Sequence, residues 1–507
     1  SGTHGKGWRS SNDKTDVDDL LLKGSYQLTS KSSLSASLHH FEGKGEMPGG
    51  LTTKQYAVDP FQSTRNYDQF TGRRTDGSLK YSYKDGRDNF EVLSYYVDSF
   101  RGSYIERDAT GANTGKRSLT AAPRNYSYYG VEPRYSRIFE TGSVVQEVSV
   151  GYRYLNEKSS ETALATSGFY VPGQVDAMAL PLNVTQTSQG GTTANAFYID
   201  NRIDVGNWTI TPGVRYERIR SFNNVVDYKG STAAAIYPTA AANEWLPTLS
   251  VLYRVNSQWT VFANAGKSFG PQQYAQLAQS SNNQLYPESA KTYELGTHYK
   301  SDTWNGELTL FNIDFDKELF LDRPGDGTGN GIWTDLGATR HRGLESALRY
   351  DFGKNYPALK GFSLGATYTF TQATSQAGPF AGRDLPLYAR HTAGLSARYA
   401  VDRWTFNAEL NAQSKQRSPG TPGTSGKPNP YVTQEDANGN LGDIPGFAIL
   451  GLRTSYQGGK ELNNLRLTVG VKNVFDRRYF TRSTDNNGGG KYVGMPRTVY
   501  LQASLPF

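Results

Sequence analysis

The residues best suited to chemistry are the arginines of residues 99–139, a stretch that reads as two strands joined by a basic loop. Arg101 lies on the first strand and Arg124 lies at the start of the second, so both flank the same loop. A planar guanidinium stays charged and pairs with carboxylates through two parallel hydrogen bonds. The two strands are expected to hold this basic loop over a pore, which makes its arginines the first candidates for a non-covalent binding site.

Other reactive residue types form no recognisable site. His39 and His40 are adjacent on a predicted strand, so their rings point to opposite faces and cannot bind one metal ion together. His298, His341 and His391 lack a second ligand at metal-binding spacing. Scattered Ser, His and Asp residues give no nucleophile–base arrangement beyond what chance supplies. We therefore expect no metal site, no cofactor and no enzyme activity.

Composition limits the elements that can position the arginines. The 507 residues include 54 Gly and 34 Tyr, and the mean hydropathy is −0.62. No run approaches the roughly 18 consecutive apolar residues of a transmembrane helix, which excludes a helical membrane protein. The net charge of +7 is too small for this length to indicate a nucleic-acid partner. A soluble all-β protein and an outer-membrane β-barrel both remain possible at this step.

Alternation of apolar and polar residues with period two is the strongest local signal. Within residues 145–155, for example, Val148, Val150 and Tyr152 share one face of a predicted strand. A β-sandwich core would produce the same alternation. Charged residues at the polar positions in mid-strand suit a wet lumen better, and aromatic residues near strand ends, such as Trp404, suit interfacial girdles.

Connection lengths favour the barrel. Short turns, such as residues 85–88, alternate with long polar segments, such as residues 156–194 and 415–446. We expect about nineteen antiparallel strands, each of about 9–14 residues. The first and last of these strands both run inward, so an odd number of strands should precede Ser1. Residues 1–507 are therefore expected to be the C-terminal portion of a longer protein.

Several segments resemble the barrel of TonB-dependent outer-membrane receptors. They are residues 244–269 (EWLPTLSVLYRVNSQWTVFANAGKSF), 287–296 (PESAKTYELG), 341–345 (HRGLE), 470–480 (GVKNVFDRRYF) and 495–507 (MPRTVYLQASLPF). Others resemble the ferric citrate receptor subfamily: residues 47–51 (MPGGL), 59–74 (DPFQSTRNYDQFTGRR), 99–103 (SFRGS), 147–155 (EVSVGYRYL) and 207–213 (NWTITPG). The resemblance implies a barrel of about 22 strands in the full protein. Residues 1–507 would be that barrel without its N-terminal plug domain, TonB box and first strands.

The resemblance also implies the residues that hold the substrate. The citrate-binding arginines on two neighbouring strands correspond to Arg101 and Arg124. A further family arginine corresponds to Ser188 or Gln189, and a polar amide of the family corresponds to Arg323. One positive charge is thus lost and one is gained, so we expect an anionic iron chelate whose shape can differ from that of ferric citrate.

Two further groups of residues have expected roles. Gln273 lies with Gln272 and Tyr274 in one of two long loops which, in the family, fold over bound substrate. A set of loop arginines is expected to attract anions to the vestibule through the field of its charges. This set comprises Arg65, Arg73, Arg74 and Arg117.

The expected function is TonB-dependent active uptake of an anionic ferric chelate, foremost ferric citrate or dicitrate, across the outer membrane of a Gram-negative bacterium. The alternatives are a receptor for another carboxylate-type ferric siderophore, a passive porin and an outer-membrane enzyme. The expected partners are the chelate, the TonB complex and outer-membrane lipid, with no nucleic acid. Iron enters only as part of the transported chelate.

Overall fold

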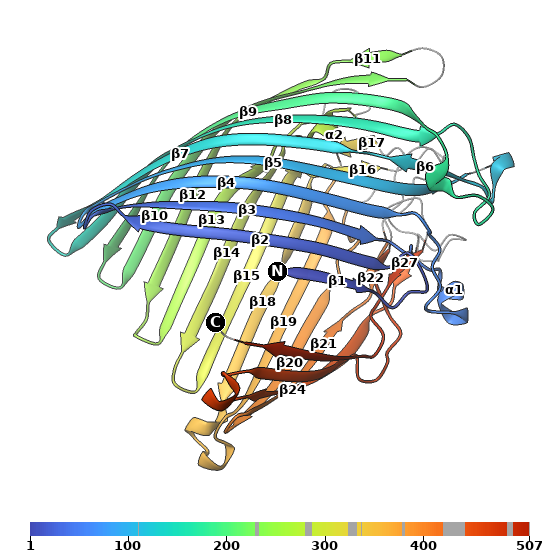
Figure 1. Ribbon diagram of the computed structural model, residues 1–507. Helices are drawn as coiled ribbons and strands as arrows, with labels where there is room; N and C mark the ends of the chain where they lie inside the picture. Colours follow the sequence, from blue (N-terminus) through green and yellow to red (C-terminus); the bar gives the residue numbers. More distant parts are fainter. Residues whose placement is uncertain are drawn as a thin grey trace.

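A single large sheet dominates the molecule. The computed structural model describes residues 1–109, 111–228, 233–278, 286–322, 332–335, 337–377, 381–418, 442–483 and 490–505. Most of them form one antiparallel sheet of 22 strands that curls round into a barrel wall (Figure 1). The longer strands pair with each other in chain order, and a few short strands pair alongside them. This arrangement confirms the expected all-β antiparallel barrel.

The strand number can be compared with the expectation. In the described part of the chain, three of the 22 strands have five residues or fewer, namely β1 (Gly2–Lys6), β6 (Arg117–Ala121) and β11 (Ala234–Ile236). Removing them from 22 leaves nineteen longer strands, the expected number. The longer strands are β2 (Lys14–Gln27), β3 (Ser32–Glu46), β4 (Gln69–Asp85), β5 (Asp88–Asp108), β7 (Arg124–Thr141), β8 (Val144–Thr166), β9 (Leu182–Val205), β10 (Trp208–Asp227), β12 (Thr239–Arg254), β13 (Trp259–Gly270), β14 (Glu288–Lys300), β15 (Trp304–Lys317), β18 (Thr339–Asp351), β19 (Phe362–Ser375), β20 (His391–Val401), β21 (Trp404–Gln413), β24 (Phe447–Gln457), β25 (Arg466–Lys472) and β28 (Thr498–Ser504).

Small elements decorate the ends of the wall. Three short hairpins are β16 (Leu319–Asp322) with β17 (Ile332–Asp335), β22 (Gln416–Arg417) with β23 (Asp443–Ile444), and β26 (Phe480–Ser483) with β27 (Lys491–Val493). The helices are α1 (Thr53–Val58) and α2 (Tyr274–Ala278), with single turns η1 (Gly111–Asn113), η2 (Ala177–Ala179), η3 (Phe352–Lys354), η4 (Pro357–Leu359) and η6 (Lys460–Leu462). No described helix has both the length and the apolar character needed to cross a membrane.

The two ends of the wall differ in their connections. Tight turns join the strands at one end, whereas α1, β6, β22 and β27 lie at the other end (Figure 1). Gly86, Gly142 and Gly206 occupy turns with φ of 55°, 61° and 54°, a left-handed conformation that costs glycine little. Short turns on one side and longer loops on the other agree with the pattern expected for an outer-membrane barrel.

The strands beside the longest loops extend further than expected. β5, β8 and β9 contain 21, 23 and 24 residues, well above the expected 9–14. Their outer parts are polar on both faces, so apolar alternation stops while the backbone ladder continues. The segment 156–194 was therefore wrongly assigned to one long loop, because hydrogen bonding and not hydrophobicity holds its strands together.

Aromatic pairs mark two levels on one face of the wall. Cross-strand partners share a face, and Trp208 with Tyr253 and Tyr216 with Trp245 are such partners, with ring centroids 4.5 and 4.8 Å apart. Trp208 and Tyr216 are eight residues apart on β10, about 26 Å along the strand and about 18–21 Å in height at a strand tilt of about 35–45°. An outer-membrane barrel has an apolar band about 25 Å tall between its girdles. This face is therefore the lipid face, and the alternate residues face the lumen.

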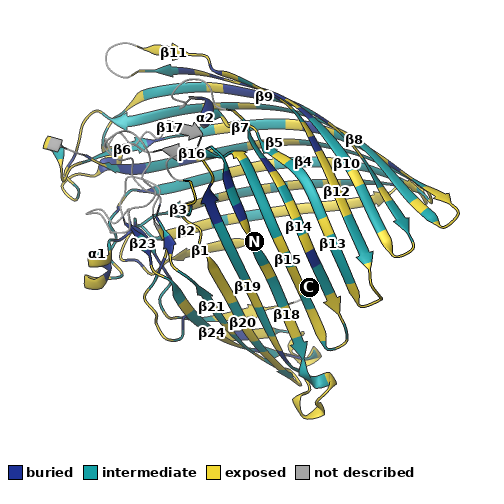
Figure 2. Ribbon diagram, turned by 180° about the vertical axis from the view of Figure 1, so that it is seen from behind, coloured by how far each residue is buried: buried dark blue, intermediate teal, exposed yellow. Residues whose placement is uncertain are grey.

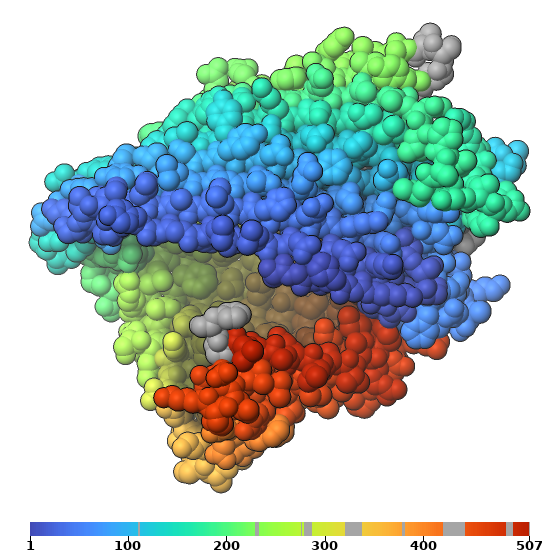
Figure 3. Space-filling model, viewed as in Figure 1, coloured from blue at the N-terminus to red at the C-terminus, as the bar shows by residue number. Residues whose placement is uncertain are grey.

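The wall is open along one line. In the described part of the chain β1 pairs with β2 alone and β28 with β25 alone, so no ladder joins β1 to β28. Figure 3 shows the opening between the blue N-terminal strands and the red C-terminal segments, with the lumen behind it.

Candidate functional site

Arg101 and Arg124 lie directly opposite each other. The register of β5 and β7 pairs Arg101 with Arg124, so both side chains leave the same face of the sheet. Tyr96 and Val92, which lie an odd number of residues from Arg101 on β5, belong to the lipid face together with Leu79 and Tyr81 of β4. Both arginines therefore face the lumen, near the end of the wall that bears the loops.

The same cross-strand row continues over two more strands. Arg124 pairs with Glu161 of β8, and Glu161 pairs with Ser188 of β9. A guanidinium nitrogen of Arg124 lies 2.8 Å from a carboxylate oxygen of Glu161, and both side chains are about one-third exposed, at 29% and 31%. The row formed by Arg101, Arg124, Glu161 and Ser188 is called the arginine row below, and its formal charge is +1.

The two arginines differ in their surroundings. Arg101 is exposed, its guanidinium lies over the ring of Phe70 at 5.1 Å, and no carboxylate of the described residues pairs with it. Arg124 is half-buried, and its Nε atom is buried with no hydrogen-bond partner among the described residues. The row thus presents one free guanidinium and one that is only partly satisfied, an arrangement suited to an incoming carboxylate.

Ser188 and Gln189 lie on opposite faces. Ser188 faces the lumen within the arginine row, whereas Gln189 pairs with Ser160 and faces outward. Of the two positions that could correspond to the family arginine, Ser188 is the one beside Arg124 and Glu161.

The loop before α2 reaches the wall just below the row. The hydroxyl of Tyr274 lies 2.9 Å from Oγ1 of Thr192, and Nδ2 of Asn223 donates to the Tyr274 carbonyl at 3.0 Å. A Cβ atom at Gly190 would lie 2.7 Å from the Tyr274 ring, so glycine allows this close approach. Burial raises the pKa of Tyr274.

Gln273 and Arg323 do not join this constellation. Gln273 is exposed, and its backbone N–H donates to Oε1 of Gln276 at 2.6 Å, so Tyr274 makes the contact with the wall. Arg323 lies outside the described residues.

Two of the four arginines expected to attract anions to the vestibule are instead held by carboxylates, and of these Arg65 is buried while the Arg117 side chain is 16% exposed. Arg65 is 1% exposed and bonds to Asp108. Arg117 lies 2.9 Å from Asp108 and 3.2 Å from Glu106, which is fully buried. The expectation is wrong for this pair, because each guanidinium is already held by carboxylates. Arg74 also has a carboxylate partner, Asp76, at 2.7 Å.

The buried carboxylates tie several loops together. Oε2 of Glu106 accepts from the backbone N–H of Asn66 at 2.6 Å, and Oε1 accepts from the Tyr170 hydroxyl at 2.9 Å. Asp68 accepts from the backbone N–H of Glu106 at 2.6 Å, and its burial raises its pKa to about 7. Burial and the Glu106 carboxylate also raise the pKa of Tyr170. This cluster is an architectural support of the loops.

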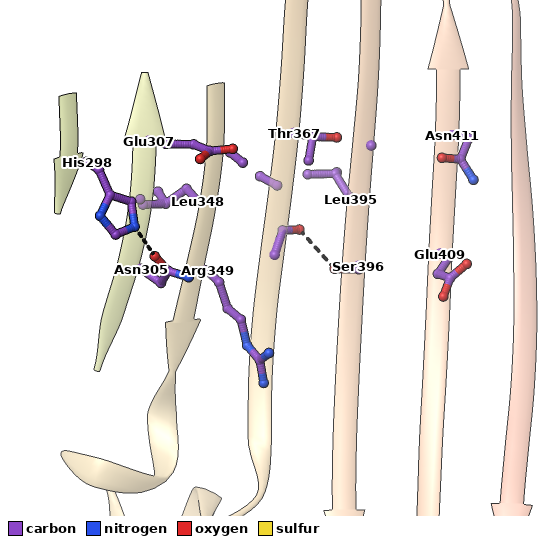
Figure 4. A pocket seen from close by; sticks show the side chains of 15 residues that line it. His298, Asn305, Glu307, Leu348, Arg349, Thr367, Leu395, Ser396, Glu409 and Asn411 are labelled. Carbon is purple, nitrogen blue, oxygen red and sulfur yellow. Dashed lines mark hydrogen bonds between the residues drawn. The ribbon is translucent and has the colours of Figure 1, made fainter. Parts of the chain in front are cut away.

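A second luminal recess of about 410 Å³ lies toward the tight turns. His298 and Asn305 meet there at 3.1 Å, and Glu307, Arg349 and Glu409 also line it (Figure 4). Glu409 forms an ion pair with Arg453 at 3.2 Å, and Glu307 offsets the charge of Arg349, so the recess offers no excess of positive charge to an anion. The described residues contain no group of three or more His, Cys, Asp or Glu side chains placed to hold a metal ion.

Sequence reasoning missed Glu161 and the wall contacts of Tyr274. Glu161 fell inside a segment assigned to a loop, where no cross-strand register could be written. The composition of residues 156–166 gave no strand signal, because Asn, Glu, Lys and Ala, which are depleted in strands, make up most of it.

Comparisons with known proteins agree with this architecture. A family model described as "TonB dependent receptor-like, beta-barrel" matches residues 7–474. The crystal structure of the ferric citrate transporter FecA in its unliganded form superposes with a TM-score of 0.86 at 37% identity, covering 99% of this chain and 72% of that one. The ferric-catecholate import receptor Fiu from E. coli K12 superposes with a TM-score of 0.78 at 17% identity, covering 99% and 76%.

Curated relatives are more distant in sequence. The metal-pseudopaline receptor CntO of Pseudomonas aeruginosa is 22% identical over 380 residues, 72% of this chain and 49% of the relative. The ferric enterobactin receptor PirA of the same species is 22% identical over 495 residues, 90% of this chain and 60% of the relative. The chain thus spans about half to three-fifths of the length of these relatives. From the family match and the fold, the chain belongs to the TonB-dependent receptor-like β-barrel family, whose members are receptors and transporters of the Gram-negative outer membrane and not enzymes.

Proposed function

We propose that this chain is the barrel of a receptor that takes up an anionic ferric chelate, with ferric citrate as the first candidate. The observation that supports the proposal is the register pair of Arg101 and Arg124, both facing the lumen. Cross-strand partners of like charge repel each other and destabilise a sheet unless a counter-charge lies between them. One carboxylate, Glu161, meets Arg124, so the row has capacity for another.

Ferric citrate fits the chemistry of the arginine row. It is an iron complex wrapped in carboxylates with a net negative charge, and guanidinium groups bind carboxylates through paired hydrogen bonds. Arg101 offers an exposed guanidinium, and Phe70 beneath it restricts its orientation. Arg124 becomes available when a carboxylate of the chelate displaces Glu161 from its guanidinium group.

The comparisons support the class of substrate, a ferric chelate, more strongly than they support one particular chelate. The FecA structure, at 37% identity, is that of a ferric citrate transporter. The more distant relatives are named for ferric enterobactin and metal-pseudopaline. Ser188, where the family resemblance implies an arginine, leaves room for a different carboxylate-type ferric siderophore as the second candidate.

Uptake would be powered through the TonB complex. The resemblance implies a plug domain and a TonB box, and we propose that these parts, outside residues 1–507, couple the barrel to that complex. α2 and its neighbours would cover the chelate from the lumen side, since Tyr274 already contacts the wall two positions below Ser188.

The test is binding of ferric citrate to the full-length protein and to R101A/R124A. Charge-assisted hydrogen bonds contribute about 1.5–3 kcal/mol each, so the double variant should bind at least about 100-fold more weakly. R73A is the matched control, because Arg73 is exposed on the outward face. Unchanged affinity in R101A/R124A would reject the arginine row as the site. Tight binding of another ferric siderophore, lost in the same variant, would keep the site and correct the substrate.

A further inference from the structure

Three cations stand on the outward face of the wall, beyond its aromatic row. Tyr152, Phe197, Tyr216 and Trp245 are successive cross-strand partners on β8, β9, β10 and β12. Phe197 and Trp245 are 51% and 61% exposed. Further along these strands toward the loops, the same face carries a second set of residues, which is basic. The basic set comprises Lys158, Arg218 and Arg220.

Alternation separates this basic set from the lumen. Arg218 and Arg220 alternate along β10 with Glu217, Ile219 and Ser221, which are buried on the luminal side. Lys158, Arg218 and Arg220 are all exposed. Exposed and less exposed positions intermingle along the strands of the wall (Figure 2).

The basic set has no internal counter-charge. Luminal arginines nearby share a carboxylate partner, since Arg215 and Arg153 lie 2.6 and 3.6 Å from Glu217. By contrast, no described carboxylate forms an ion pair with Lys158, Arg218 or Arg220. The three like charges lie on β8 and β10, with β9 between them, and an external anion bound there would relieve their repulsion.

The surface between the cations is hollowed. A recess of about 500 Å³ is lined by Lys158 and Arg220, with Thr193 and Phe222 between them. The Phe222 ring lies over Gly191, where no Cβ is present to fill the space. The recess therefore has a basic rim and an aromatic floor.

Its height relative to the membrane follows from the strand geometry. Arg218 and Arg220 are two and four residues beyond Tyr216 on β10, and Lys158 is six residues beyond Tyr152 on β8, which is about 7, 13 and 20 Å along the strands. At a strand tilt of about 35–45°, the cations lie about 5, 10 and 15 Å above the aromatic row that marks the outer edge of the apolar band, which is the head-group region and the layer just outside it.

We propose that this basic recess binds the phosphorylated head group of an outer-leaflet lipid, with the acyl chains lying along the aromatic row below it. Charge complementarity, the aromatic row and the head-group level select a lipid over a soluble anion. This inference is independent of the proposed substrate, because the recess and the arginine row lie on opposite faces of the sheet.

Native mass spectrometry of the detergent-purified full-length protein tests the proposal, with bisphosphorylated lipid A as the probe. K158Q/R218Q/R220Q should lower the bound fraction at a fixed lipid concentration at least about tenfold relative to wild type. The matched control is K300Q/K354Q/K360Q, which removes three exposed charges near the tight turns. It should retain the lipid. K158R/R218K/R220K keeps all charges and should also retain it, which separates lost charge from disturbed folding.

Three results would overturn the proposal. They are equal lipid retention by K158Q/R218Q/R220Q and wild type, equal binding of dephosphorylated lipid A, and displacement of the lipid by millimolar inorganic phosphate, which would mean a site for a free anion. Ferric citrate affinity is measured in parallel and should not change in K158Q/R218Q/R220Q, so failure of this inference and failure of the proposed substrate give different results.

Discussion

Glu161 occupies one of the two guanidinium groups that we propose for the substrate. An anionic chelate must displace this carboxylate from Arg124, so the ion pair opposes binding. Because both side chains are about one-third exposed, solvent screens the pair, and it contributes up to about 1 kcal/mol. E161Q should therefore bind ferric citrate about fivefold more tightly, as measured by isothermal titration calorimetry. E132Q is the control, since Glu132 pairs with Arg134 instead. Weaker binding by E161Q would mean that Glu161 holds Arg124 in its binding position.

Position 188 offers a test of charge at one register position. An arginine introduced by S188R would lie beside Glu161, pair with it and release Arg124 for the chelate. We expect S188R to raise ferric citrate affinity several-fold and to strengthen its dependence on low ionic strength. Q189R adds the same charge on the outward face and should leave affinity unchanged. Equal effects of the two variants, measured by titration at two salt concentrations, would show that only net charge matters.

Residue type alone could not separate the arginines that we propose to bind substrate from those that support the loops. Arg101 and Arg65 look alike in sequence, since each lies in a polar stretch near a predicted strand end. The difference arises from chain segments that are distant in sequence, because Asp108 forms an ion pair with the buried Arg65, whereas the exposed Arg101 lies over the ring of Phe70. The family resemblance selected Arg101 and Arg124, and the register then placed them opposite each other.

At the scale of elements, apolar alternation was sufficient to predict the strands that cross the membrane. Val148, Val150 and Tyr152 share the outward face of β8 because lipid on one side and a wet lumen on the other require that pattern. The pattern stops where water contacts both faces, so the outer half of β8 was not predicted, and Glu161 was missed with it. Register across several strands depends on pairings that no single segment encodes.

The loop cluster around Asp68 gives a pH prediction. Asp68 has a pKa of about 7 in the folded protein against 3.8 when exposed, so the folded loops retain its proton more firmly. The contribution of this pKa shift to the stability of the loops is therefore fully present below pH 3.8, and it is lost as pH rises through 7. Hydrogen exchange of residues 47–68 should accelerate from pH 5 to 7, after correction for intrinsic rates, and level off above.

D68N provides the comparison for that experiment. Its amide oxygen can still accept from the Glu106 backbone N–H, but it does not titrate. The corrected exchange of residues 47–68 in D68N should be independent of pH over the same range. If D68N shows the same pH profile as the wild type, another group of the cluster causes the effect.

At the scale of the whole molecule, loops join the two edges of the open sheet. Leu51, after β3, forms two backbone hydrogen bonds of 2.9 and 2.8 Å with Lys491 of β27. Its side chain is fully buried in a cluster with Tyr56, Phe480 and Val493. Segments near the first and last strands of the described sheet are thereby joined above the opening, where β1 and β28 form no ladder.

Truncating Leu51 should therefore loosen the whole wall and not one loop. L51A keeps the backbone bridge but leaves a cavity in a fully buried cluster, which costs about 2–5 kcal/mol. We expect faster hydrogen exchange in residues 51 and 491–493 together, and a lower temperature for the loss of compact mobility in semi-native electrophoresis. L79A removes the same atoms from a lipid-facing leucine that is 49% exposed, so it should change neither measurement. If L51A and L79A behave alike, the cluster does not join the two edges, and each edge must be stabilised by its own strands.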